Sequence, residues 1–189
     1  MPRAGLTPHR VVEEAARVAD DVGWERLTLA AVAERLDVRL PSLYKHVPSL
    51  EALRSGVRAQ ATRELADTLT KAVLGSAGGE ALRAVASSYR VFAREHPGRY
   101  EATIAAPSPD DAEHLAAADA ALHVIEATLR GYRLEGEDAV DAARALRASL
   151  HGFVHLEGAG GFGLPVDVDR SFARMVESLD VTLRGWAAG

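Results

Sequence analysis

Five side chains within an eight-residue stretch carry hydrogen-bond donors suited to nucleic acid: Arg39, Ser42, Tyr44, Lys45 and His46. Such donors contact phosphate oxygens and the edges of bases. Leu40, Leu43 and Val47 are interleaved with them at spacings of three and four, so these apolar residues share one helix face. We expect that face to point inward, which leaves the polar set available to DNA.

Each of these residues also has a plainer interpretation. Tyr44 could fill a core position, His46 could bridge two helices, and Arg39 could be an ordinary surface cation. Their shared exposed phase favours contact with DNA for Tyr44 and Arg39 and leaves His46 undecided.

Charge is distributed unevenly along the chain. The net charge is −5, but residues 35–58 hold five bases and two acids, and residues 61–189 are acidic. A small basic segment on an acidic body is typical of a DNA-reading module attached to another domain.

The elements that position this stretch are helical. Thr28 can cap a helix, Leu36-Asp37-Val38 forms a tight turn, and Pro41 suits the first turn of the next helix. Ser49 can then cap a long helix that ends near Leu74. Two short helices joined by a tight turn, with a third packed behind, form a helix-turn-helix. No segment alternates with period two, so the sequence predicts an all-α fold of about nine helices.

Composition excludes several classes of function. The chain of 189 residues is 48% apolar and has no cysteine, which excludes disulfides and thiolate catalysis. No leader segment and no apolar run of about 18 residues is present, so we expect a cytoplasmic protein. His151 and His155 share a helix face, but no third metal ligand is suitably spaced. Residues 158–163 match G-x-G-x-x-G without a preceding strand, and no catalytic triad is found. We expect no enzyme activity, cofactor or metal.

Residues 28–47 resemble the N-terminal domain of the tetracycline-repressor (TetR) family. The preceding Gly23, the cap at Thr28 and the run Leu43-Tyr44-Lys45-His46-Val47 carry this resemblance, which covers about 50 residues. It implies that Tyr44 contacts DNA backbone or base, that Lys45 and His46 contact phosphates, and that Arg39 and Ser42 face bases or phosphate.

Three positions depart from the family pattern. Asp37 replaces the usual glycine of the turn, and Arg39 replaces a capping hydroxyl. Leu50 replaces a lysine that often binds phosphate at the start of the following helix. Either Arg54 or the free amides at that helix's N-terminus must then take over the phosphate contact.

The remainder of the chain resembles the family's C-terminal domain less closely. Residues 90–100 and Leu150-His151-Gly152 carry that resemblance, which implies dimerisation and an effector pocket. We expect a DNA-binding domain over residues 1–50 and an effector-binding and dimerisation domain over 51–189, with a glycine-rich linker at 75–79. Small residues in the 137–157 helix and an apolar stripe on the last helix predict a four-helix dimer interface. Alternatively, both stripes pack inside one subunit.

The candidate lining residues of a pocket among the middle helices are mostly apolar, with a few polar groups. They are Tyr89, Phe92, Tyr100, Leu122, His123, Ile125, Phe153 and His155. Each could also be ordinary core. Together they complete the prediction of a homodimeric regulator, interpreted as a repressor that a small-molecule effector releases from a palindromic DNA operator. Activation stays open, and the alternative is an all-α enzyme or sequestering protein with a degenerate reading head.

Overall fold

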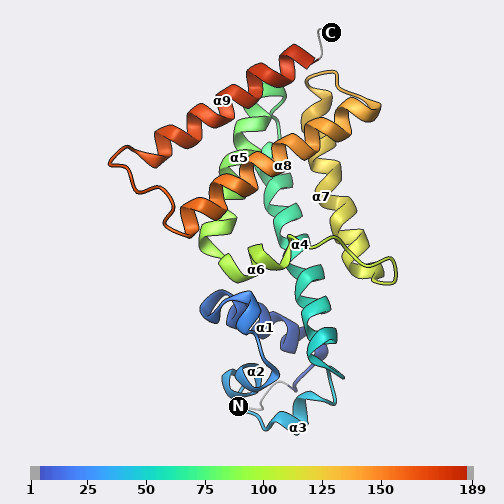
Figure 1. The fold of residues 1–189 in the computed structure, drawn as a ribbon. Coiled ribbons are helices and arrows are strands. Elements are labelled where there is room, and N and C mark those ends of the chain that lie inside the picture. The colour runs from blue at the N-terminus through green and yellow to red at the C-terminus, as the bar shows by residue number, and fades with distance from the viewer. Residues whose placement is uncertain (1–4, 187–189) are drawn as a thin grey trace. The chain divides into compact units, whose positions relative to one another are not determined.

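The structure, a computed structural model, describes residues 5–186. Within this range the chain forms nine α-helices, one short 3-10 helix and no strand (Figure 1), which confirms the predicted all-α fold. In chain order they are α1 Pro8–Val22, η1 Trp24–Arg26, α2 Leu29–Arg35, α3 Leu40–Leu43, α4 Leu50–Val73, α5 Gly78–Glu95, α6 Pro97–Ala102, α7 Ala112–Arg130, α8 Gly136–Gly158 and α9 Val168–Trp186. None of these helices is long and apolar enough to cross a membrane.

The chain divides into two compact units. The first comprises Met1–Ala66 and Glu95–Ala120, and the second comprises Asp67–Arg94 and Ala121–Gly189. The predicted functional boundary after residue 50 therefore lies inside the first unit. That unit contains the predicted DNA-binding domain of residues 1–50, which we call the reading head. It also contains the start of α4, all of α6 and the start of α7.

Side-chain caps start the helices of the reading head. The Thr7 hydroxyl accepts a hydrogen bond from the Arg10 amide at 3.2 Å, and the Thr28 hydroxyl accepts one from the Ala31 amide at 3.2 Å. Each cap satisfies an amide that lacks a partner within its helix. Gly23 ends α1 with a φ of 94°, a conformation that costs glycine little.

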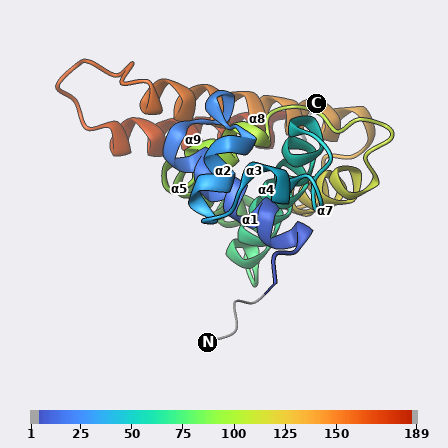
Figure 2. The ribbon, with the colours of Figure 1, turned by 90° about the horizontal axis from the view of Figure 1, so that it is seen from below.

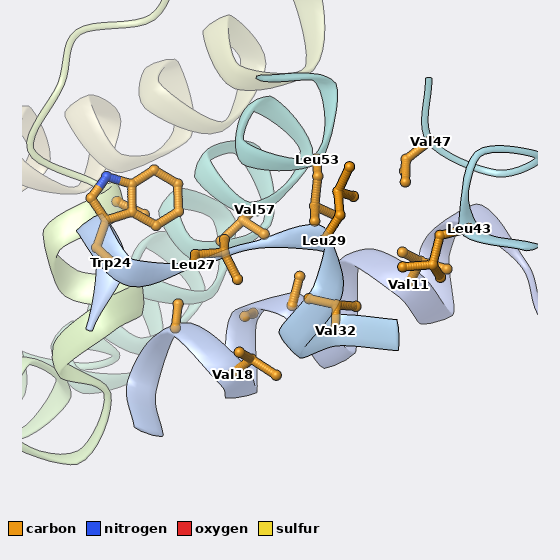
Figure 3. Packing of buried hydrophobic residues seen from close by; sticks show 14 of the residues in the cluster. Val11, Val18, Trp24, Leu27, Leu29, Val32, Leu43, Val47, Leu53 and Val57 are labelled. Atoms are coloured by element: carbon orange, nitrogen blue, oxygen red, sulfur yellow. The ribbon is translucent and has the colours of Figure 1, made fainter. Parts of the chain in front are cut away.

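One apolar core holds the reading head together (Figure 3). Val11 of α1, Val32 of α2 and Leu43 of α3 are each fully buried, and Leu53 and Val57 of α4 close the core. The buried members at helical spacing in α1 and α4 are the reason these helices pack against α2 and α3.

Helix α6 docks onto α1 at a point where only glycine fits. A Cβ atom on Gly98 would lie 2.0 Å from the carbonyl oxygen of Ala19. This short helix spans Pro97–Ala102. Pro97 suits the first turn because it has no N–H to leave unsatisfied, so the helix starts there.

In the second unit, α8 and α9 lie side by side (Figure 2). The buried residues of each helix recur at helical spacing, so each helix buries one face. They are Ala142, Leu146, Leu150 and Val154 of α8, and Phe172, Val176 and Leu183 of α9. The apolar stripe of the last helix is thus used within the subunit.

Candidate DNA-binding surface

The turn between α2 and α3 has a left-handed residue at the position where the family usually has glycine. Asp37 has a φ of 53°, and its amide donates to the Glu34 carbonyl at 3.0 Å. The Val38 amide donates to the Ala33 carbonyl, also at 3.0 Å. These bonds close the end of α2, so aspartate takes the place of the usual glycine without disturbing the turn.

Helix α3 is a single turn, and the chain continues from it in hydrogen-bonded turns. The amides of His46 and Val47 both donate to the Leu43 carbonyl, at 2.8 and 2.9 Å. Leu43 is fully buried and Val47 is 5% exposed, so these two side chains pin the segment to the core. The prediction that Leu40 also faces inward is wrong, because its side chain is 37% exposed. One turn of helix can direct only part of its side chains at the core, and Leu43 occupies that position.

The predicted donors project from this pinned segment. Tyr44 is 52% exposed, which rules out its interpretation as a core residue. Arg39 and Lys45 are exposed, and Ser42 and His46 are half-buried. Within residues 5–186 the side chains of Arg39, Tyr44 and Lys45 have no bonding partner in the chain, so they are available to an external ligand.

The other three bases of the basic segment are engaged internally. Arg35 bonds Asp21 at 2.6 Å and Glu14 at 3.1 Å, and these carboxylates, Asp21 first, raise the pKa of its guanidinium. Arg58 pairs with Glu51 at 2.7 Å. The excess positive charge counted along residues 35–58 is therefore not all available to DNA.

Arg54 is also held against the core. Its Nη2 donates to the Glu25 carbonyl at 3.1 Å, and its guanidinium lies 5.5 Å from the centre of the Trp24 ring. Leu50, which replaces the family's lysine, packs against the reading-head core. At the start of α4 the Ser49 hydroxyl accepts from the Ala52 amide at 3.0 Å, and the amides of residues 50 and 51 precede the first intrahelical bond.

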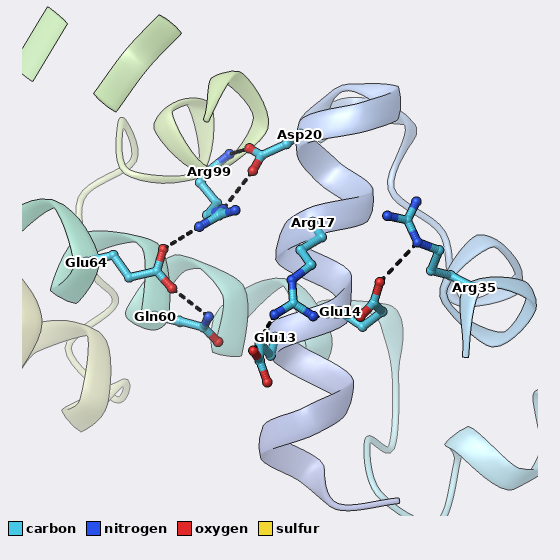
Figure 4. A network of polar contacts seen from close by, with 8 residues as sticks. All are labelled: Glu13, Glu14, Arg17, Asp20, Arg35, Gln60, Glu64 and Arg99. Atoms are coloured by element: carbon cyan, nitrogen blue, oxygen red, sulfur yellow. Dashed lines mark hydrogen bonds and ion pairs between the residues drawn. The ribbon is translucent and has the colours of Figure 1, made fainter. Parts of the chain in front are cut away.

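Sequence reasoning missed the polar network that joins α6 to the reading head (Figure 4). The Arg99 amide and Nε both donate to Asp20, at 2.8 and 2.7 Å, and Nη1 donates to Glu64 at 2.9 Å. Burial opposes the charge of Arg99, but the hydrogen bonds that it donates to Glu64 and Asp20 outweigh this effect and raise its pKa. No periodicity in the sequence pairs residues so far apart in the chain.

The predicted pocket residues differ widely in exposure. Tyr89, Phe92 and Tyr100 are buried. Ile125 and Phe153 are half-buried, whereas Leu122, His123 and His155 are exposed. Tyr100 belongs to the first compact unit and the other seven to the second. The pocket stays a prediction.

The fold and the exposed donors on the turn fixed by Leu43 define a helix-turn-helix protein. Comparison of the chain with known proteins identifies its family. Residues 82–179 match the sequence profile described as the tetracyclin repressor-like C-terminal domain. The chain is 40% identical over 174 residues to the uncharacterized HTH-type transcriptional regulator Rv0681 of Mycobacterium tuberculosis, covering 92% of this chain and 79% of that protein. It is 32% identical over 188 residues to YobS, an uncharacterized HTH-type transcriptional regulator of Bacillus subtilis, covering 100% and 94%.

The chain therefore belongs to the TetR family of transcriptional regulators. Its fold is similar to that of a TetR variant from Acinetobacter baumannii AYE crystallised with minocycline, with a TM-score of 0.73 and 22% identity over 98% of this chain and 100% of that one. The family consists of regulators, so the alternative of an all-α enzyme is excluded.

Proposed function

We propose that the protein is a homodimeric repressor that acts in the cytoplasm and releases a palindromic operator when a small-molecule effector binds. The observation that carries the DNA-binding part is the exposure of Arg39, Tyr44 and Lys45 on a turn fixed by buried Leu43. Thr28, Ser42 and His46 complete the proposed contact surface. Because Arg54 is held inward, the free amides at the start of α4 are the better replacement for the missing lysine.

The two lysines of the chain provide a matched test of this surface. Lys45 lies in the proposed interface, and Lys71 is exposed near the end of α4. We expect Lys45→Ala to weaken binding to the DNA upstream of the protein's own gene. It should also lower the slope of log K against log salt by about 1.8, because the dimer loses two phosphate contacts. Lys71→Ala should change neither quantity. Fluorescence anisotropy at several salt concentrations measures both, and equal effects of the two variants would refute the proposed surface.

Apolar side chains left exposed on α8 and α9 support the proposed dimer. Leu156 is 49% exposed and Val181 is 66% exposed, although the main apolar faces of these helices are already buried. Ala148 and Gly152 precede Leu156 at spacings of four, and a Cβ on Gly152 would meet nothing within 4 Å. This face of α8 therefore combines small residues with uncovered apolar surface, which suits close packing against a second copy.

A charge placed on this face tests the dimer. Ala148→Glu should convert the protein to a monomer in light scattering and abolish binding to a two-half-site operator, because a carboxylate buried between subunits has no partner. Ala116→Glu, at an exposed position of α7, is the control and should leave the mass unchanged. A dimer that persists in the Ala148→Glu variant would exclude this face as the interface.

The effector part of the proposal rests on the family and on the predicted pocket. A true effector must both raise the melting temperature and release operator DNA, since it binds one state of the protein in preference to the other. A thermal-shift screen followed by DNA-release measurements tests this requirement. Compounds that stabilise the protein without weakening its DNA complex would contradict control by release.

A further inference from the structure

A groove of about 760 Å³ opens between the first part of α4 and the connection from α6 to α7, within the first compact unit. Residues 51–59 form one wall and residues 105–114 form the other. Much of its lining is small: Ala52, Gly56, Ala59, Ala105, Ala106 and Ala112. The groove shares no residue with the predicted effector pocket, and it shares only Glu51 with the proposed DNA contacts, which use the backbone amide of that residue.

A buried histidine without a partner lines this groove. His114 is 2% exposed, and its backbone amide donates to the Asp111 carboxylate at 2.9 Å. Its imidazole has no hydrogen-bonding partner among residues 5–186. Burial lowers the pKa of His114. The negative charge of Asp111 opposes this shift, and the positive charge of Arg58 adds to it. The neutral ring offers one donor and one acceptor. Neither ring nitrogen is among the fully buried polar atoms without a partner in the described chain, so both are open to a ligand in the groove.

The charge of the groove is predominantly negative. Four carboxylates line it, from Glu51, Asp110, Asp111 and Glu113, against the single cation of Arg58. Two of them are engaged, because Glu51 pairs with Arg58 and Asp111 accepts from the Ser55 hydroxyl.

The other two carboxylates are open to a ligand. Asp110 and Glu113 are exposed, and their side chains have no partner in the part of the chain that the structure describes. No group of three or more potential metal ligands occurs in that part either. The groove thus lacks a metal cluster and is unfavourable for an anion.

We propose that this groove binds a small organic cation, with its ammonium group paired to Asp110 and Glu113 and its apolar body packed along the alanine walls. The imidazole of His114 supplies the remaining hydrogen bond. Apolar walls with a few well-placed polar groups are the usual composition of a small-molecule site. The site does not depend on the proposed repressor function, because ligand binding is measured without DNA.

Three probes of similar shape and different charge test the charge preference. We would titrate the full-length protein, labelled with ¹⁵N-histidine, with benzylamine, benzyl alcohol and benzoate. Benzylamine should shift the imidazole signals of His114, which are assigned by their loss in His114→Gln, and should bind at least about tenfold more tightly than the other two. At about 100 times its Kd it should raise the melting temperature by about 5 °C or more.

A surface variant keeps the test independent of folding. The double change Asp110→Asn and Glu113→Gln should weaken benzylamine binding about tenfold or more. The charge-matched pair Glu137→Gln and Asp138→Asn, exposed at the start of α8, should leave it unchanged. Equal affinity in both double variants would overturn the proposal. So would tighter binding of benzoate, or the absence of His114 shifts with benzylamine, cyclohexylamine and putrescine.

Discussion

Two arginines nine positions apart, Arg90 and Arg99, connect helices in different parts of the molecule by donating hydrogen bonds to two carboxylates each. In the first unit, Arg99 of α6 bonds Asp20 of α1 and Glu64 of α4. In the second unit, Arg90 of α5 bonds Glu157 at the end of α8, at 2.8 and 2.6 Å, and Asp169 at the start of α9 at 2.7 Å. Each guanidinium thus ties together three helices that are distant in the sequence.

The surroundings of the two arginines differ. The Arg90 guanidinium lies 4.7 Å from the ring centre of Phe172 and 5.6 Å from that of Phe153, whereas Arg99 packs beside the close backbone contact at Gly98. Aromatic rings exclude water, so the ion pair of Arg90 acts in a less polar medium. Its hydrogen bonds lower the pKa of Glu157 although burial opposes them. The comparison predicts that the free energy of unfolding falls more when the Arg90 contacts are broken than when contacts of the first unit are broken.

Removing Arg90 should have the largest effect. We expect Arg90→Met to lower the free energy of unfolding by about 4 kcal/mol, because Glu157 is left unpaired beside apolar rings. Arg174→Met, at an exposed position of α9, is the control and should cost less than about 0.5 kcal/mol. Urea unfolding measures both, and similar values would show that the aromatic setting adds nothing.

The pH dependence of this anchor follows from the lowered pKa of Glu157. A carboxyl whose pKa is lower in the folded state stabilises the fold above its unfolded pKa, about 4.3 for glutamate. This stabilisation is lost as the pH falls through the folded-state pKa. The stability difference between the native protein and Arg90→Met should therefore be constant near neutral pH and shrink below about pH 4. A constant difference down to acidic pH would contradict the ion pair.

Changing Gly98 in the first unit should have the second-largest effect on stability. Gly98→Ala places a Cβ against the Ala19 carbonyl, so we expect a loss of about 3 kcal/mol in the free energy of unfolding from overpacking. Gly185→Ala in α9 meets no atom within 4 Å and should leave stability the same or slightly higher. Thermal unfolding of the two variants checks this, and a harmless Gly98→Ala would show that α6 does not dock closely onto α1.

Two neighbouring aspartates give the smallest expected contrast. Asp20 is 12% exposed and accepts two bonds from Arg99, whereas Asp21 is 56% exposed and pairs with Arg35. Asp20→Ala should cost about 2 kcal/mol and Asp21→Ala less than about 1 kcal/mol, since exposed pairs contribute little. Calorimetry of both variants sharpens the comparison, and reversed values would assign the anchoring to Arg35 instead of Arg99.

Local signals in the sequence predicted the reading head closely. The caps at Thr28 and Ser49 occur as expected, and the tight turn at Asp37 forms as expected. The exposure of Tyr44 and Lys45 follows from the same local pattern. Capping and turn formation depend on residues a few positions apart, so the sequence displays them directly. The predicted inward orientation of Leu40 is wrong because helical spacing does not define a buried face in a helix of only one turn.

By itself, the sequence determined the helical class, the helix-turn-helix and the exposure of Arg39, Tyr44 and Lys45. Tertiary structure alone decided which arginines are free. Arg35, Arg39, Lys45, Arg54 and Arg58 look alike in the chain, yet three of them are held by partners up to 29 residues away. It also decided that Arg90 and Arg99 are anchors and that His114 is buried beside a groove. Such pairings arise from packing between distant segments, for which local periodicity contains no signal.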